Sequence, residues 1–286
     1  MDKNTVFTYE NSIGSLTFGV DTAFWLSEVT GASSVEVELT ETRTDEQSGA
    51  VLAGQSAAPR SLTLDGCIFE PLQANRRQLL RVMAPLMPAR LTKRDAGGTY
   101  WLDVVPQKTP EVSAGQGVQY FQAQLRASWP FWRSAAQHRT TVAGLQALFA
   151  FPFNTGGSWM LSQYTQNYFC SIPNSGNVPI PFQVVFTAEG RVENPWLYHM
   201  GTRRQIRLQM DMQAGQQVRV STQPGGKGVW LETGGLSENA FKHLAVESDL
   251  SMALLPGENL LRLGADSFRE NLSASLNAPA GVISGV

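Results

Sequence analysis

Alternation of apolar and polar residues with a period of two recurs along this 286-residue chain and restricts what it can fold into. In residues 34–40, Val35, Val37 and Leu39 alternate with polar residues. Because the side chains of a strand point alternately to its two faces, this pattern predicts a half-buried strand. No stretch approaches the ~18 apolar residues of a membrane-spanning helix. The chain is therefore expected to be globular, mainly β and without a membrane span.

The same pattern predicts further short strands along the chain. In residues 118–127, Phe121, Ala123 and Leu125 share one face, and residues 205–212 alternate most clearly of all. Short strands separated by glycine or proline turns are typical of a β-sandwich or a barrel. The remaining expected strands are residues 61–64, 100–105, 182–187, 217–221, 228–232 and 259–263.

Two segments depart from the strand pattern in the first half. Residues 75–83 have helical spacing, with Asn75 as the expected N-cap and Pro85 as the stop. Residues 45–58 are small and polar, and predict a long loop or an arm-like hairpin. A polar, aperiodic stretch after residue 132 places the domain boundary near residue 138, which gives domains 1–138 and 139–286.

No arrangement of residues predicts catalysis, a cofactor or a metal. His138, His199 and His243 are isolated in the sequence, so metal-ligand spacing is missing. Cys67 and Cys170 lie far apart and are expected to be buried thiols. No serine lies in a nucleophile elbow. The expected lists of catalytic, cofactor-binding and metal-binding residues are therefore empty, and the chain is expected not to be an enzyme.

Charge and glycine content also argue against phosphate-bearing partners. The chain has 22 basic and 24 acidic residues, so no basic surface is expected for a nucleic acid. Residues 225–228 (GGKG) lack the spacing of a phosphate-binding loop and predict a hairpin turn.

Two carboxylate pairs leave an alternative open. Glu189 with Glu193, and Glu247 with Asp249, could serve a glycosidase, which needs two carboxyl groups ~5–10 Å apart. A chain with 24 acidic residues supplies such pairs by chance, so structural or solvated carboxylates are the simpler interpretation.

Two tryptophans leave a second alternative open. Trp196 and Trp230 could stack on sugar rings, which would make the chain a carbohydrate-binding host-adhesion module; core tryptophans are the simpler interpretation. Charged residues make up only 16% of the chain. Since interface cores are poor in charge, part of the exterior is expected to be covered by other subunits.

In the second half, residues 255–263 (LPGENLLRL) place a proline and glycine turn before a strand, and Asn259 can satisfy local backbone groups there. This is the most specific of the pieces by which the second half resembles the distal tail proteins of long-tailed bacteriophages. The first half follows the same family order less specifically, through residues 49–52, 58–66, the helix and the SWPFW run at 128–132. The other matching segments of the second half are residues 181–187, 190–197 and 202–212, the turn at 214–216, and the returning strand at 218–222.

This resemblance implies a tail-tip hub protein of a phage or prophage. It implies a hexameric ring, with residues 1–138 as a split-barrel belt domain and residues 139–286 as a galectin-like β-sandwich. Such a ring connects the tail tube protein to tip or baseplate proteins and leaves a central channel for DNA, without sequence-specific binding of nucleic acid. The implied location is the virion tail tip, after synthesis in the cytoplasm of a bacterial host, and no cofactor is implied.

Overall fold

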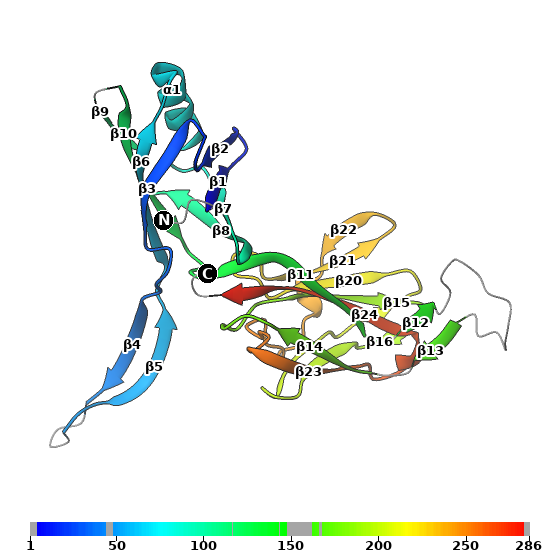
Figure 1. Ribbon diagram of the computed structural model, residues 1–286. Helices are drawn as coiled ribbons and strands as arrows, with labels where there is room; N and C mark the ends of the chain where they lie inside the picture. Colours follow the sequence, from blue (N-terminus) through cyan, green and yellow to red (C-terminus); the bar gives the residue numbers. More distant parts are fainter. Residues whose placement is uncertain are drawn as a thin grey trace, which may run out of the picture. The chain divides into compact units, whose positions relative to one another are not determined.

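A computed structural model describes residues 5–43, 48–115, 117–142, 144–147, 162–165 and 168–282 (Figure 1). The chain divides into two compact units, Met1–Ala136 with Gly281–Val286, and Gln137–Ala280. Strands dominate the described residues of both units, and the single α-helix among them lies in the first. The expected mainly β class is confirmed.

Seven strands of the first unit form a closed barrel. They follow the order β8-β7-β1-β2-β3-β6-β10, and β10 pairs again with β8 to close the ring of strands. β9 (Glu111–Ala114) extends the sheet beyond β10, and β11 (Trp132–Val142) pairs with β8. The barrel strands are β1 (Val6–Glu10), β2 (Ser15–Phe18), β3 (Phe24–Thr30), β6 (Arg60–Ile68), β7 (Ala89–Asp95), β8 (Gly98–Pro106) and β10 (Gln119–Ala127).

The barrel core is built from the alternating faces that the sequence predicts. Phe121, Ala123 and Leu125 of β10 are buried, as are Leu62 and Leu64 of the neighbouring β6. Both predicted strands are therefore confirmed, including the face that each one buries.

Helix α1 (Leu72–Val82) confirms the predicted helix but begins earlier than expected. The N-cap position is Pro71, so the expectation that Asn75 caps the helix is wrong. The backbone N–H of Asn75 already donates to the Pro71 carbonyl, and its buried side-chain amide donates back to the Phe69 carbonyl at 2.7 Å. Proline is tolerated at the start of a helix because the N–H that it lacks would have no partner within the helix.

Strands β4 (Val37–Thr42) and β5 (Val51–Ala57) form a separate two-stranded hairpin, called the arm below, which projects from the barrel (Figure 1). The expected hairpin is present, but it starts before residue 45 because β4 is one of its two strands. The expected half-burial of residues 34–40 is wrong within one chain. Every residue of β4 is exposed, and Val37 and Leu39 are each 56% exposed.

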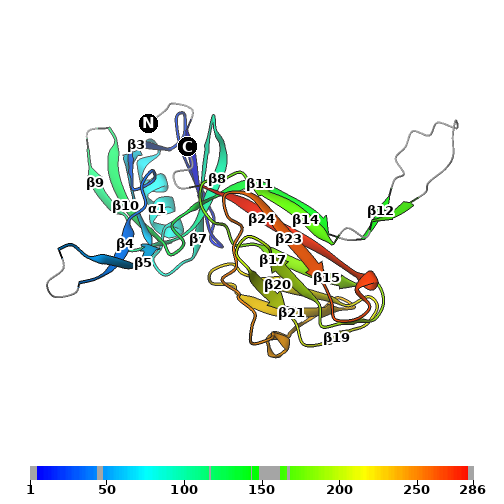
Figure 2. The same cartoon turned by 90° about the horizontal axis from the view of Figure 1, so that it is seen from below.

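The second unit is a β-sandwich around its own apolar core. One sheet has the order β22-β21-β20-β15-β24-β11, and the other has the order β14-β23-β17-β18 (Figure 2). Two further pairs of strands, β12–β13 and β16–β19, form separate two-stranded sheets. The strands are β12 (Gly144–Ala147), β13 (Ser162–Thr165), β14 (Phe169–Asn174), β15 (Gln183–Ala188), β16 (Val192–Glu193), β17 (Trp196–His199), β18 (Arg204–Arg207), β19 (Asp211–Met212), β20 (Gln217–Ser221), β21 (Gly228–Thr233), β22 (Leu236–Asn239), β23 (Gly257–Gly264) and β24 (Leu272–Val282).

The predicted continuous strand at residues 205–212 is wrong, because the chain divides there into β18 and β19. β18 pairs with β17, whereas β19 pairs with β16. Ile206, Leu208 and Met212 are all fully buried. The alternation therefore reports burial correctly, although the segment changes its hydrogen-bonding partner halfway.

Candidate interaction surfaces

One face of the arm is apolar and uncovered. Glu41 pairs across the hairpin with Leu52 and therefore shares a face with it, and strand alternation places Val37 and Leu39 on that same face. These four residues, Val37, Leu39, Glu41 and Leu52, are called the arm face below. Leu52 is 54% exposed. Because a lone two-stranded hairpin is marginally stable in water, an arm of this kind gains stability from a further contact.

A buried arginine fixes the root of the arm. The Arg60 side chain is 4% exposed and donates through Nε to the Pro130 carbonyl at 2.6 Å and through Nη1 to the Gly31 carbonyl at 2.8 Å. It also donates to the Ala32 carbonyl at 2.5 Å, which accepts a second bond from Trp132 Nε1 at 3.0 Å. Burial lowers the pKa of Arg60 to about 10. The segment entering the arm is thus bonded to the barrel, and the direction of the arm is set.

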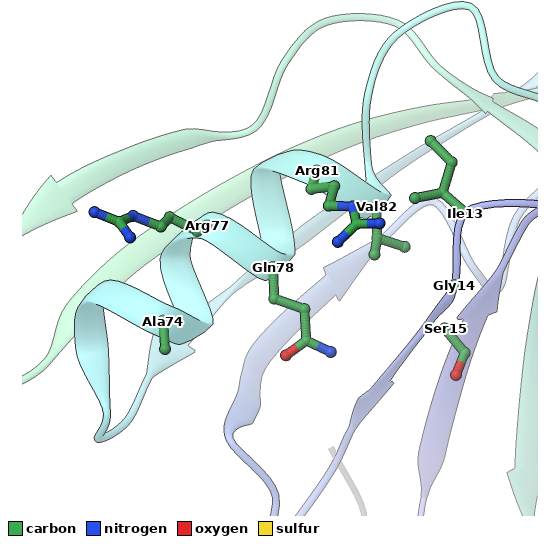
Figure 3. A pocket seen from close by; sticks show the side chains of 8 residues that line it. All are labelled: Ile13, Gly14, Ser15, Ala74, Arg77, Gln78, Arg81 and Val82. Atoms are coloured by element: carbon green, nitrogen blue, oxygen red, sulfur yellow. The ribbon is translucent and has the colours of Figure 1, made fainter.

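A cavity of about 390 Å³ lies between α1 and the turn that joins β1 to β2 (Figure 3). Arg77 and Arg81 line it from the helix, one turn apart, and Ile13 and Val82 supply apolar walls. Both arginines are exposed, and neither has an ion pair or hydrogen bond with another described residue. The cavity therefore offers positive charge next to apolar surface, with Gln78 and Ser15 as further polar groups.

Three of the four carboxylates that suggested a glycosidase are engaged with arginines. Glu193 lies 2.5 Å from Arg191, and Glu247 lies 3.5 Å from Arg207. Asp249 forms an ion pair with Arg204 at 3.1 Å, and Glu189 is exposed. These contacts are those of structural or solvated carboxylates.

The two candidate tryptophans are half-buried. The ring of Trp196 lies so close to Gly264 that a Cβ there would stand 2.1 Å from it. The guanidinium of Arg219 lies 4.2 Å from the ring centre of Trp230, whose ring also contacts Gly228. Both rings therefore pack on the protein over part of their surface, and sugar stacking on them stays a hypothesis.

The two histidines whose side chains the structure describes have different partners. His199 is buried and its Nε2 faces Asn259 Oδ1 at 3.0 Å, whereas His243 lies in the short 3₁₀ helix Phe241–His243. The side chain of His138 is outside the described residues. Among the described residues, no three His, Cys, Asp or Glu side chains gather as metal ligands would.

Both cysteines are buried free thiols, as predicted. Burial raises the pKa of Cys67, and it raises that of Cys170 to about 11. The predicted turn joins β20 to β21, where the Gly226 N–H donates to the Gln223 carbonyl, and Gly228 is already the first residue of β21. No described helix is both long and apolar enough to cross a bilayer.

Asn259 organises the turn before β23. Its Oδ1 accepts the Leu255 N–H at 2.7 Å, and its Nδ2 donates to the carbonyls of Leu255, Gly257 and Ile172 at 2.7, 3.0 and 3.3 Å. The expectation that this side chain satisfies local backbone groups is confirmed.

Comparison with known proteins identifies the fold. No family model and no curated protein matches the sequence. Among solved structures, the SPP1 Dit (gp 19.1) protein, described as a paradigm of the hub adsorption apparatus in phages infecting Gram-positive bacteria, matches with a TM-score of 0.66 at 13% identity. The match covers 95% of this chain and 98% of that one.

Two structures of the phage p2 baseplate in its activated conformation, one with Ca and one with Sr, match with TM-scores of 0.51. Their identities are 10% and 9%, and each match covers 96% of this chain and 97% of the other. Both units of this chain thus have the fold of Dit and baseplate proteins, and the expectation drawn from the sequence resemblance is confirmed at the level of the fold.

Proposed function

We propose that this chain is a structural, non-enzymatic hub protein at the tail tip of a phage or prophage. The observation that carries the proposal is the end-to-end match to SPP1 Dit, which covers 95% of this chain and both of its units. A likeness limited to one common β-domain would carry far less weight, because folds recur with unrelated functions.

The proposed form is a hexameric ring with a central channel for DNA. Residues 1–138 would form the ring as a belt domain, and residues 139–286 would form a galectin-like domain directed outward. The ring would join the tail tube protein to tip or baseplate proteins, in a virion whose parts are made in the host cytoplasm. A ring needs one patch of each subunit to contact a different patch of the next.

The arm supports an assembled state. Its face carries Val37, Leu39 and Leu52, each more than half exposed, in the alternating pattern of a strand that is to be buried. Because nothing among the described residues of the same chain covers this face, a neighbouring subunit is the proposed cover. Burial there would also account for part of the low charge of the chain.

Electron microscopy of the purified full-length protein tests the function, with light scattering to measure its mass. We expect six-fold rings with a central opening. The ring would be contradicted by particles without rotational symmetry, provided that light scattering at the same concentration gives a mass above that of a monomer.

An arm deletion tests the contact. Glu36 and Ala58 are hydrogen-bonded across the root at 2.9 Å, so a two-glycine linker can replace residues 37–57 without stretching the barrel. We expect a folded monomer. A second test keeps the arm and changes only its apolar face. The double variant Leu39→Ser, Leu52→Ser should weaken assembly. The control Glu38→Ser, Thr40→Ser changes the opposite face of the arm and should assemble like wild type.

A further inference from the structure

We infer that the arm face of one copy docks into the α1 cavity of a second copy, with Glu41 placed against Arg77 and Arg81. This inference rests on the proposed homo-oligomer and adds to it the surface that receives the arm. The chemistry of both surfaces and the direction of the arm support it.

Charge is complementary between the two surfaces. Helix α1 contains three arginines and no acidic residue. Arg77 and Arg81 lie four residues apart on the helix and both line the cavity. In Figure 3, Arg81 points toward Val82 and Ile13, whereas Arg77 extends in the opposite direction along the helix. Glu41 is exposed on the arm face and, among the described residues, has no ion pair. Two arginines and one carboxylate, none of which has a partner among the described residues of its own chain, would satisfy each other between chains.

The apolar groups are complementary as well. On the arm, Leu39 and Leu52 lie beside Glu41; in the cavity, Ile13 and Val82 lie beside the arginines. Interfaces of this composition bury an apolar centre and exclude water from the charged groups around it, which strengthens the attraction between them. Glu38, on the opposite face of the arm, would remain in solvent.

The occupant of the cavity must come from a second copy. In Figure 1 the arm leaves the barrel at the end away from α1. Arg60 holds the carbonyls of Gly31 and Ala32 at the root of the arm, and Ala58 is bonded to Glu36 there. These bonds prevent the arm from folding back toward the cavity of its own chain.

Charge reversal with complementation in mixtures tests the contact. The two variants are Glu41→Arg, and Arg77→Glu combined with Arg81→Glu. We expect each variant alone to show an apparent dissociation constant raised about 100-fold, because like charges then face each other. An equimolar mixture should assemble to within about threefold of wild type, since every arm then meets a cavity of opposite charge in an alternating order.

Matched controls separate this contact from a general effect of charge. Glu38→Arg changes the same strand on its other face, and Arg76→Glu changes the same helix outside the cavity lining. Both should assemble like wild type. Circular dichroism and thermal unfolding establish that every variant is folded.

Three outcomes would overturn the inference. If both reversed variants assemble like wild type, the docking site is wrong while the proposed hub function stands. If each variant fails alone and the mixture also fails, Glu41 does not pair with these arginines. If wild-type protein remains monomeric at the highest concentration reached, the docking and the proposed ring are both overturned.

Discussion

Asn259 supplies the partners that the turn before β23 lacks in its own backbone. It is 1% exposed and serves as both acceptor and donor to that turn. The sequence indicated this role because asparagine after proline and glycine commonly bonds to local backbone. It did not indicate that the same amide reaches Ile172, 87 positions away, because no local pattern records which distant strand will lie alongside.

Replacing Asn259 by Asp tests its donor role. The carboxylate keeps the shape but offers no N–H to the three carbonyls, and it places a negative charge at a buried position beside them. We expect a loss of about 3 kcal/mol in the free energy of unfolding, measured with urea. Asn239→Asp is the control, since the exposed Asn239 only accepts a bond, from the Phe241 N–H, and aspartate accepts it as well.

Asp95 links the stability of the barrel to pH. Burial of the Asp95 carboxyl raises its pKa. Hydrogen bonds from Lys93 and from the Gly97 N–H lower the pKa by more than burial raises it, so the pKa of Asp95 lies below its usual value. A carboxyl whose pKa is depressed by folding stabilises the fold above its unfolded pKa, about 4, and this contribution is lost as the pH falls through the folded pKa.

We therefore expect Asp95→Asn to be less stable than wild type at pH 7 by roughly 1–3 kcal/mol, with the difference shrinking as the pH falls below about 4. Urea unfolding across the pH range measures this. Glu10→Gln, at an exposed carboxylate, is the control. A difference that stayed constant down to pH 2 would contradict the assignment.

At the scale of elements, the sequence indicated that a face is buried but not by what. The alternation in residues 34–40 predicted a strand correctly, yet its apolar face is open in the single chain. Likewise, helical spacing predicted α1 but did not predict that Arg77 and Arg81 have no ion pair with any other described residue. Their signal was available, since a helix with three arginines and no acid has no partner charges of its own.

Several strands gave too weak a pattern to be expected. β24 (LSASLNAPAGV) contains small residues and a proline, which have low strand propensity, although it pairs with β15 along six residues. β1 to β3 were also not expected, and they contribute buried residues such as Phe7 and Phe18 to the barrel. Backbone pairing with neighbouring strands stabilises these segments where their own sequence has low strand propensity.

The turn into the arm depends on a glycine. Gly31 has a φ of +81°, and a Cβ there would lie 2.1 Å from the Ser61 carbonyl oxygen. Gly31→Ala should therefore lower the free energy of unfolding by roughly 3 kcal/mol or more, measured by urea unfolding. Gly49, with a φ of +93° and no atom within 4 Å of such a Cβ, is the matched control; Gly49→Ala should cost only about 1 kcal/mol. Equal losses would show that crowding at Ser61 is unimportant.

At the scale of the whole molecule, the two units have separate cores. We expect two calorimetric transitions. Leu64→Ala, in the barrel core, should cost roughly 3 kcal/mol, which lowers the barrel transition by about 10 °C and leaves the sandwich transition nearly unchanged. Leu261→Ala, in the sandwich core, should lower the sandwich transition by a similar amount and leave the barrel transition nearly unchanged. A single transition that both variants lower equally would show instead that the units unfold together.

The mainly β class and many of the strands could be read from periodicity, whereas assembly could not. Composition suggested covered surface, because only 16% of the residues are charged. It could not say which face is covered, since that depends on where the barrel directs the arm.

Because the arm and the cavity inferred to receive it belong to one chain, a damaged copy has a particular genetic effect. A chain without its arm would still accept the arm of a neighbour, yet could not reach the next subunit. Co-expressed with wild type, it would enter growing assemblies and end them. An arm deletion is therefore expected to be dominant negative, because chains from the altered gene copy would prevent the completion of complexes that contain normal chains.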